Sequence, residues 1–340
     1  MRVPASALLG SLIASVIGAI ASAATLDSVR ERGFVNCGVG ENFPGFFAPD
    51  GAGNWSGFDV DFCRALSAAI FTDPSKVKYL PATPAARFAQ LQSAQVDLLS
   101  RSVTWTMSRD GGLGLSFSGV TFFDGQGLMV RKALGAKSAK DLDGATVCVQ
   151  TGTTTELNLA DYFRAQAMKF TPVVFETTDQ VLAAYEAQRC DVYTTDKSTL
   201  SARLGKLKDP AAHVILPETI SKAANGPIVR QGDGQWANIV RWTLNALIAA
   251  EELGITSSNV EQMKSATKDP EARRLLGVDG ELGKLIGLDN DWAFKIIKAV
   301  GNYGEIYERN LGAKGAVVIP RDGLNRLWKS GGLLFSPSFQ

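Results

Sequence analysis

Residues 146–166 read TVCVQTGTTTELNLADYFRAQ, and this stretch decides the fold class. The apolar segment 146–150 has the composition of a buried strand, and residues 155–166 carry apolar side chains at helical spacing. A Gly-Thr-Thr turn, Gly152 to Thr154, joins the two. In open α/β sheets, ligands bind beyond the carboxyl ends of strands and near helix N-termini. The stretch therefore predicts an α/β fold and a position for a binding site.

The same alternation of short strands and amphipathic helices extends in both directions. Predicted strands are 34–40, 76–79, 96–100, 172–175, 191–194, 214–215 and 228–230, and predicted helices are 59–70, 85–93, 179–187, 197–204, 236–252, 260–265, 271–276 and 291–309. The strand–helix pattern starts once near residue 34 and again near residue 146. With 340 residues, 45% of them hydrophobic, this predicts two α/β lobes, each a parallel-type sheet with flanking helices.

Charged and hydroxyl residues follow three of the predicted strands. Ser102, Thr104 and Arg109 follow 96–100, Thr153 and Thr154 follow 146–150, and Asp196 follows 191–194. A free α-amino acid carries a carboxylate and an ammonium, so a dry pocket must offer it a cation and an anion with hydrogen-bond partners. Arg109 supplies a planar guanidinium for the carboxylate, and Asp196 supplies an acceptor for the ammonium.

Each of these residues also has a purely structural interpretation. An arginine in a strand–helix loop, such as Arg109, is more often on the surface than in a binding site. Asp196 suits the N-cap of the helix beginning at Lys197, and the threonines at 153 and 154 suit a helix start. The same helix start favours an anionic ligand group.

The N-terminus predicts export. Arg2 precedes an apolar run from Ala7 to Ile20, and Ala21-Ser22-Ala23 offers a small-x-small cleavage site, which is the pattern of a secretory signal peptide over residues 1–23. An uncleaved anchor is the weaker alternative, because the run is short for a membrane span. Cleavage near Ala23 removes only Arg2 among charged residues and leaves 34 basic against 34 acidic side chains. A neutral chain argues against a nucleic-acid partner.

Four cysteines remain after export, at positions 37, 63, 148 and 190. An even count in an oxidising compartment favours disulfides over four buried thiols. Three connectivities are open; we favour the lobe-local pairs Cys37–Cys63 and Cys148–Cys190. With no CxxC and a single histidine, His213, the sequence predicts no metal site and no cofactor.

An ordered series of motifs resembles the polar amino-acid binding proteins of ABC transporters, solute-binding protein family 3. The series is GFDVD (57–61), QSAQVD (92–97), TWTMSR (104–109) and FS (117–118). Longer runs resemble the general L-amino-acid binding proteins within that family: CVQTGTTTELNLADYFRA (148–165), RCDVYTTD (189–196), QWANIVRWTLNALIAAEELG (235–254) and AVGNYGEIYERN (299–310). The likeness covers the chain from about residue 26 to the end.

The resemblance implies a type II periplasmic-binding-protein fold whose two lobes are joined by a two-strand hinge. The crossings are expected near 129–132 and 228–231, giving lobe 1 as residues 24–131 and 228–340 and lobe 2 as 132–227. Arg109 is expected to clamp the ligand carboxylate with the backbone around Thr104 and Thr154. Asp196 is expected to take the ammonium with an oxygen of Ser102, and Phe43 to stack over the ligand.

The implied function is a monomeric periplasmic protein that captures L-amino acids and delivers them to the permease subunits of an ABC importer. We expect broad specificity with polar and acidic side chains favoured. Gly40 stands where relatives selecting cationic ligands often carry a carboxylate, and Arg101 adds positive charge beside Ser102. The alternatives are an exported dehydratase- or lyase-like enzyme on the same scaffold, or an amino-acid sensor. An enzyme needs a general acid or base in the cleft, whereas His213 matches no site motif and no catalytic residue is predicted.

Overall fold

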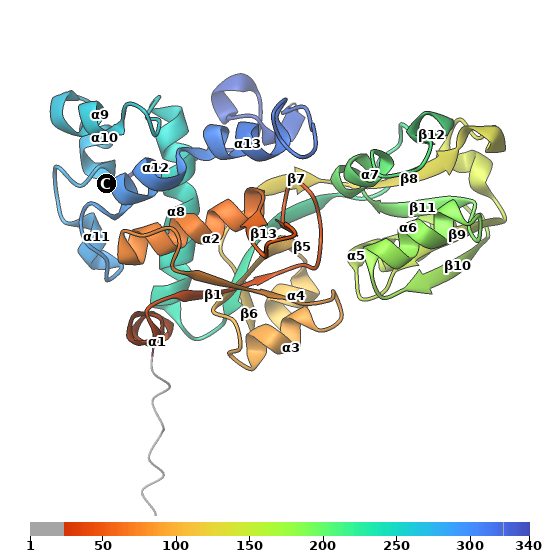
Figure 1. The fold of residues 1–340 in the computed structure, drawn as a ribbon, viewed down its shortest axis with the longest axis horizontal. Coiled ribbons are helices and arrows are strands. Elements are labelled where there is room, and N and C mark those ends of the chain that lie inside the picture. Colours follow the sequence, from red (N-terminus) through yellow and green to blue (C-terminus); the bar gives the residue numbers. More distant parts are fainter. Residues whose placement is uncertain (1–23, 322) are drawn as a thin grey trace, which may run out of the picture.

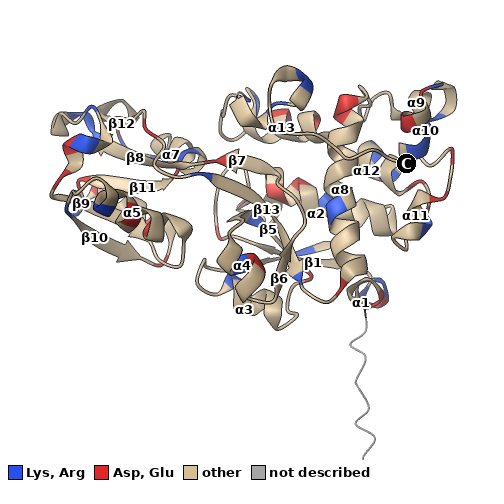
Figure 2. Cartoon of the chain, turned by 180° about the vertical axis from the view of Figure 1, so that it is seen from behind, with Lys and Arg blue, Asp and Glu red and all other residues tan. Residues whose placement is uncertain are grey.

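The computed structural model describes residues 24–321 and 323–340, which form two α/β lobes side by side (Figure 1). The predicted signal peptide, residues 1–23, lies outside the described residues. Within them, no helix is both long enough and apolar enough to cross a membrane. Basic and acidic positions are interspersed over both lobes (Figure 2), as expected for a chain with balanced charges.

The first lobe is built on a sheet with the strand order β4-β1-β5-β13-β6, and β7 also pairs with β13. Its strands are β1 (Val35–Val39), β4 (Val77–Pro81), β5 (Leu98–Thr104), β6 (Leu115–Phe117), β7 (Phe122–Asp124) and β13 (Ala223–Arg230). β1 runs parallel to β4 and β5, whereas β13 is antiparallel to β5, β6 and β7. A small hairpin, β2 (Ala48–Pro49) and β3 (Trp55–Ser56), follows β1.

The second lobe contains a sheet with the strand order β10-β9-β11-β8-β12. Its strands are β8 (Gln126–Arg131), β9 (Ala145–Gln150), β10 (Phe170–Phe175), β11 (Val192–Asp196) and β12 (His213–Ile215). β9 lies parallel to β10 and β11, and β8 is antiparallel to β11 and β12. Each sheet therefore has the expected parallel centre, extended by antiparallel strands that the hydropathy pattern does not reveal.

The chain crosses between the lobes earlier than predicted. Asp124 pairs with Ala223 in the first sheet, while residues 126–131 already pair with β11 in the second. The crossings therefore fall at Gly125 and just before Ala223, so the expected lobe boundaries at 131/132 and 227/228 are wrong. Residues 126–131 belong to the second lobe and residues 223–227 to the first. The sequence of residues 122–131, FFDGQGLMVR, does not show which sheet each half joins.

Helices cover both sheets. The second lobe has α5 (Thr154–Ala165), α6 (Thr178–Glu186) and α7 (Lys197–Leu204), and the first lobe begins with α1 (Thr25–Arg32), α2 (Phe58–Phe71), α3 (Arg87–Gln92) and α4 (Met107–Gly112). After β13 come α8 (Gly234–Glu252), α9 (Val260–Ala266), α10 (Pro270–Leu275), α11 (Leu282–Leu285), α12 (Trp292–Val300) and α13 (Tyr303–Leu311). The predicted single helix 291–309 is thus two helices, because α12 ends at Val300 with Gly301 as its C-cap, and Asn302 forms a capping box with Glu305.

The C-terminal helices complete the main core. α12 packs against α2 and α8, and their buried side chains form one apolar cluster with those of α1, β1 and α13. Beyond α13, Asn325 exchanges two hydrogen bonds with the backbone of Phe123, accepting from its N–H and donating to its carbonyl at 2.8 Å each. The C-terminal segment is therefore attached to β7, the strand that leads into the first crossing.

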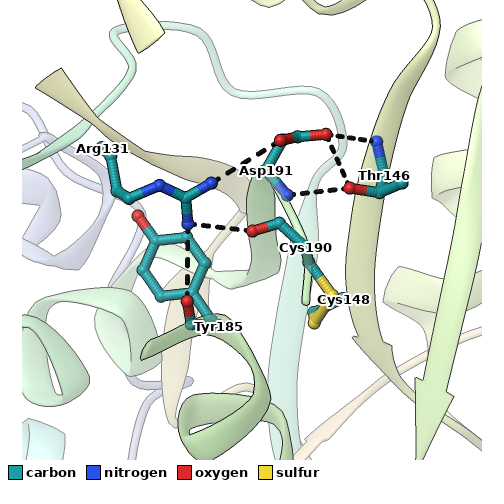
Figure 3. Close-up of a disulfide and its surroundings, with 6 residues drawn as sticks. All are labelled: Arg131, Thr146, Cys148, Tyr185, Cys190 and Asp191. Atoms are coloured by element: carbon teal, nitrogen blue, oxygen red, sulfur yellow. Dashed lines mark hydrogen bonds and ion pairs between the residues drawn. A yellow bond between two sulfur atoms is a disulfide. The ribbon is translucent and has the colours of Figure 1, made fainter. Parts of the chain in front are cut away.

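Both predicted disulfides are present, one in each lobe. Cys37 of β1 is bonded to Cys63 of α2, and Cys148 of β9 is bonded to Cys190, just before β11. Around the second bond, Arg131 donates to the carbonyl of Cys190 at 2.9 Å, and Asp191 accepts from the backbone N–H and the hydroxyl of Thr146 (Figure 3). Each bond lies inside one lobe and leaves the crossings free.

Candidate ligand-binding site

The eight residues predicted from sequence all line one cavity between the lobes. Phe43, Arg101, Ser102, Thr104 and Arg109 come from the first lobe, and Thr153, Thr154 and Asp196 come from the second. The cavity has a volume of about 100 Å³ and lies at the carboxyl ends of β1, β5, β9 and β11. This is the position that the α/β topology predicts for a ligand. Their individual binding roles remain predictions.

Arg109 lies in α4, and its side chain turns back toward the end of β5. Its Nη1 donates to the carbonyl of Thr104 at 2.9 Å, and its guanidinium carbon lies 5.3 Å from the centre of the Phe88 ring. Burial lowers the pKa of Arg109 to about 10, and the nearby charge of Asp196 opposes this shift. The guanidinium remains protonated at neutral pH, and its hydrogen bond to Thr104 fixes its position at the cavity.

Asp196 ends β11 and immediately precedes α7. Its side chain makes no capping hydrogen bond to α7, so the expected alternative role as a helix cap is not observed. Its Oδ1 is buried and has no hydrogen-bond partner among the described residues. Burial, followed by the nearby carboxylate of Asp124, raises the pKa of Asp196 to about 8, and Arg109 opposes the rise. A cationic group in the cavity would supply the missing partner.

Ser102 has a left-handed backbone conformation, with φ of 53°, which is uncommon for a residue other than glycine. Its hydroxyl donates to Asp59 Oδ2 at 2.8 Å. Asp59 is buried near the start of α2, and burial raises its pKa to about 6, while Ser102 and Arg101 oppose that rise. Because the Ser102 hydrogen is engaged by Asp59, its oxygen is left as an acceptor.

The threonines of the second lobe contribute differently. Thr153 is the N-cap of α5: its hydroxyl accepts from the N–H of Glu156 at 3.2 Å and donates to the Gln150 carbonyl at 2.7 Å. The structural interpretation of Thr153 is therefore observed, although it also lines the cavity. The Thr154 hydroxyl oxygen lies 3.4 Å from that of Thr104 in the opposite lobe.

Two phenylalanines form an apolar wall, and only Phe43 was predicted. The Phe43 and Phe47 rings meet edge to face with centroids 5.6 Å apart, and both line the cavity. A Cβ atom on Gly40 would lie 2.1 Å from the Phe47 ring. The Phe47 ring therefore occupies the space that a carboxylate at position 40 would need.

Sequence reasoning also missed two buried arginines of the cavity, Arg87 and Arg203. Arg87 begins α3 and is 3% exposed, and among the described residues no carboxylate pairs with it. Burial, followed by the charges of Arg101 and Arg109, holds its pKa well below the usual value. The sequence offered one signal for Arg87, which is a basic residue near the start of the predicted helix 85–93, just after Pro84.

Arg101 adds to this positive region. It is 8% exposed, and its Nε is buried without a hydrogen-bond partner in the described part of the chain. Burial lowers its pKa to about 10, whereas Asp59 and Glu41 act in the opposite direction. Away from Asp196, the cavity therefore has an excess of positive charge, which favours a ligand with a second anionic or strongly polar group.

The cavity has no histidine. His213 accepts or donates a hydrogen bond at 2.8 Å with the Tyr185 hydroxyl in the second lobe and does not line the cavity. Over residues 24–321 and 323–340, no group of three or more His, Cys, Asp and Glu side chains is arranged to hold a metal ion.

Comparison with known proteins matches the fold and this site to one family. The model of the bacterial extracellular solute-binding proteins, family 3, matches residues 35–258, which includes every predicted site residue. The chain belongs to this family. The match ends shortly after α8, so α9 to α13 are outside the region that the family model covers.

Relatives of this family 3 protein match almost end to end. It is 54% identical to the general L-amino acid-binding periplasmic protein AapJ of Rhizobium johnstonii, over 98% of this chain and 97% of the relative. It is 51% identical to the glutamate/glutamine/aspartate/asparagine-binding protein BztA of Rhodobacter capsulatus, over 98% and 99%. A solved periplasmic binding protein of Brucella ovis with glutathione bound has 52% identity and a TM-score of 0.91, covering 94% of this chain and 100% of that one.

Proposed function

We propose that this family 3 protein captures L-amino acids between its lobes and delivers them to an ABC importer. The observation that carries the proposal is that Arg109 and Asp196, from different lobes, line the same cavity. The first is a buried cation from lobe 1, and the second is a carboxylate from lobe 2 whose Oδ1 has no partner. A zwitterion supplies a carboxylate to Arg109 and an ammonium that favours the ionised form of Asp196, and Ser102 offers a further acceptor to the ammonium.

The ligand range follows from what the remaining cavity offers. Arg109, Asp196 and the Thr104 and Thr154 region address groups common to all amino acids, which supports broad specificity. Arg87 and Arg101 favour glutamate and aspartate, and their N–H groups also suit the amide oxygens of glutamine and asparagine. Phe47 occupies the space that a carboxylate at position 40 would need, so this position cannot pair with a cationic ligand side chain. The relatives named for general L-amino acids and for glutamate, glutamine, aspartate and asparagine support this range.

The proposed location is the periplasm, and the proposed partners are the permease subunits of an ABC importer in the inner membrane. The signal-peptide pattern, the disulfides and the periplasmic relatives support this location. We propose that the protein acts as a monomer, with a complete cleft in one chain. His213, the single histidine, does not line the cavity, so the cavity gives no support to histidine-based acid–base catalysis.

Calorimetry of unfolded and refolded, ligand-free protein against the common L-amino acids tests the proposal. We expect affinities within about tenfold, or about 1.4 kcal/mol, across glutamate, glutamine, aspartate and asparagine. D-enantiomers should bind poorly, because they cannot satisfy Arg109 and Asp196 with the side chain in the same place. Glutathione belongs in the panel, because its γ-glutamyl end carries the same zwitterion. Binding of lysine, arginine and histidine alone would contradict the proposed range.

Transport and sensing are separated by a second experiment. Deletion of the gene should abolish uptake of labelled glutamate by whole cells if the protein serves an importer. Undiminished uptake, together with normal ligand binding by the purified protein, would instead favour the sensor.

A further inference from the structure

Arg203 connects the two lobes without using a charge of the opposite lobe. It lies in α7 and is 1% exposed, and its Nη2 donates at 2.6 Å to the backbone carbonyl of Asn42, in the loop after β1. Because Asn42 belongs to lobe 1 and Arg203 to lobe 2, this hydrogen bond exists only while the lobes are together.

The guanidinium is held by its own lobe as well. Nη1 of Arg203 forms an ion pair with Asp179 at 2.5 Å, and Nη2 also donates to the Thr178 hydroxyl at 2.6 Å. Asp179 and Thr178 lie at the start of α6, in the same lobe as α7. Opening the lobes therefore leaves the arginine charge paired, so the contact with Asn42 can form and break without stranding a buried charge.

The position of Arg203 on α7 links this contact to the ligand site. Asp196, Thr199 and Arg203 are spaced i, i+3 and i+7 and all line the cavity, so they share the cleft face of the helix. The acceptor precedes Phe43, whose backbone exchanges hydrogen bonds with Phe47 at 2.7 and 2.8 Å. Arg203 thus fixes the loop that carries both aromatic residues of the cavity wall.

We propose that Arg203 is a positioning residue, a latch that holds the closed lobes through the Asn42 carbonyl and stabilises every ligand complex equally. The inference rests on the proposed function for its ligand readout. Since the acceptor is a backbone carbonyl, the latch recognises closure and not the ligand side chain. A contact made only in the closed form shifts the open–closed equilibrium by the same factor whichever ligand is bound.

Arg203→Met tests the latch, with Arg131→Met as the matched control. Arg131 is an arginine of the same lobe that donates to the Cys190 carbonyl and does not line the cavity. Kd and koff are measured for L-glutamate, L-glutamine and L-alanine by calorimetry and stopped-flow displacement. For Arg203→Met we expect Kd to rise roughly ten- to hundredfold, the range for a hydrogen bond to a charged group. The factor should be the same for all three ligands and appear mainly in koff.

Arg131→Met should leave Kd within about twofold while lowering the melting temperature. A factor that differs between ligands would mean that Arg203 contacts the ligand itself, and an unchanged Kd would mean that it is no latch; either result overturns the proposal. If Arg203→Met does not fold, Asp179→Asn serves instead, because Asp179 is exposed at the protein surface. It should produce a smaller loss, again equal for all ligands.

A ligand-free measurement separates failure of the latch from failure of the proposed function. Fluorophores are placed at Met107 and Leu157, which are 92% and 67% exposed and lie on different lobes. Single-molecule energy transfer then gives the closed population without ligand. The latch predicts that Arg203→Met lowers this population relative to wild type and Arg131→Met. Equal populations would overturn the latch even if amino acids bind, whereas a lowered population would support it even if none does.

Discussion

The hydroxyl oxygens of Thr104 and Thr154 lie 3.4 Å apart, although the two residues belong to different lobes. Thr104 also holds Arg109 through its carbonyl, and Thr154 begins the helix opposite it. The lobes are therefore in contact at the point where the ligand carboxylate is proposed to bind. Closing them around an empty cavity buries Arg109 without a carboxylate partner and raises the pKa of Asp196 to about 8. A bound zwitterion pairs Arg109 and favours the ionised form of Asp196, so we expect the ligand to stabilise the closed form relative to the open one.

Replacing Arg109 with lysine should remove most of the affinity. An ammonium group cannot donate two parallel hydrogen bonds to a carboxylate, and loss of a buried charge contact costs about 2–5 kcal/mol. Calorimetry with L-glutamate measures the loss, and Arg273→Lys, at an exposed ion pair with Asp279, is the control. Near-native affinity of Arg109→Lys for every ligand tested would exclude the proposed carboxylate clamp.

Arg87→Met should reduce the preference for glutamate over glutamine and increase the stability of the protein against urea. Without Arg87, the Kd for glutamate should rise at least about tenfold (about 1.4 kcal/mol) more than the Kd for glutamine. Arg87 also donates a 3.2 Å hydrogen bond to the Gly152 carbonyl. Its loss weakens the binding of every ligand by the same factor and therefore leaves the ratio of the two Kd values unchanged. The variant should also be more resistant to urea, because it lacks a buried arginine that has no acidic partner. An unchanged glutamate-to-glutamine ratio would place the second anionic group elsewhere.

Acidification should favour closure of the empty protein. With the lobes closed, burial raises the pKa of Asp196 to about 8, aided by Asp124 and opposed by Arg109. When the lobes open, water reaches the carboxyl group and its pKa falls back toward the ordinary value of 3.8. The closed form therefore binds more protons across this interval, and its population rises as the pH falls from about 8 toward 4. Energy transfer between labelled lobes measures this, and Asp196→Asn should reduce the pH dependence to the part contributed by Asp124, whose pKa burial raises to about 6. Greater opening at low pH would reverse the assigned sign.

Gly152→Ala should weaken ligand binding, because the added methyl group would press against the opposite lobe when the lobes close. Gly152 has φ of 70°, and a Cβ atom there would lie 3.2 Å from the Cα of Ala85 in the opposite lobe. Gly135 is the control, because it lies in the same lobe at φ of 77° with nothing within 4 Å of an added Cβ. Both alanine variants should lose about 1–2 kcal/mol of stability from the left-handed backbone. Only Gly152→Ala should lose affinity; equal affinities would show that the lobes tolerate the extra methyl group.

Reduction of the disulfides should lower stability without impairing ligand recognition. The bonds close loops with sequence separations of 26 and 42 residues. Loop-closure entropy then predicts losses of about 3.5 and about 4 kcal/mol. Urea unfolding of the paired variants Cys37→Ala/Cys63→Ala and Cys148→Ala/Cys190→Ala measures each loss separately. Where the variants remain folded, Kd should be unchanged, because both bonds lie within single lobes; a large change in Kd would connect a bond to closure.

The sequence predicted those parts of the site that lie at strand ends. Arg109, Asp196 and the hydroxyl residues follow strands, and parallel strands bring such positions to one edge of a sheet. Arg203 and Phe47 reach the cavity from within a helix and from across a tight loop. Their exposure to the cleft depends on helix rotation and loop geometry, which hydropathy does not report. The spacing from Asp196 to Arg203 was the available signal for the helix face.

The lobe boundaries were harder to predict for a related reason. Residues 122–131 read FFDGQGLMVR, and the two apolar halves of this segment pair with different sheets on either side of Gly125. Strand pairing across large sequence separations decides where the chain crosses, and a local pattern does not contain that information. In contrast, the break between α12 and α13 is indicated by two neighbouring residues, Gly301 and Asn302.

The order of the two disulfides has a consequence for biogenesis. Each bond joins consecutive cysteines, the first to the second and the third to the fourth. A chain that enters an oxidising compartment N-terminus first presents each correct partner before any wrong one from the next pair appears. Oxidation in order of emergence can therefore give the native connectivity without reshuffling of mispaired bonds. Oxidation can also be complete before residues 223–340 arrive to finish the first lobe.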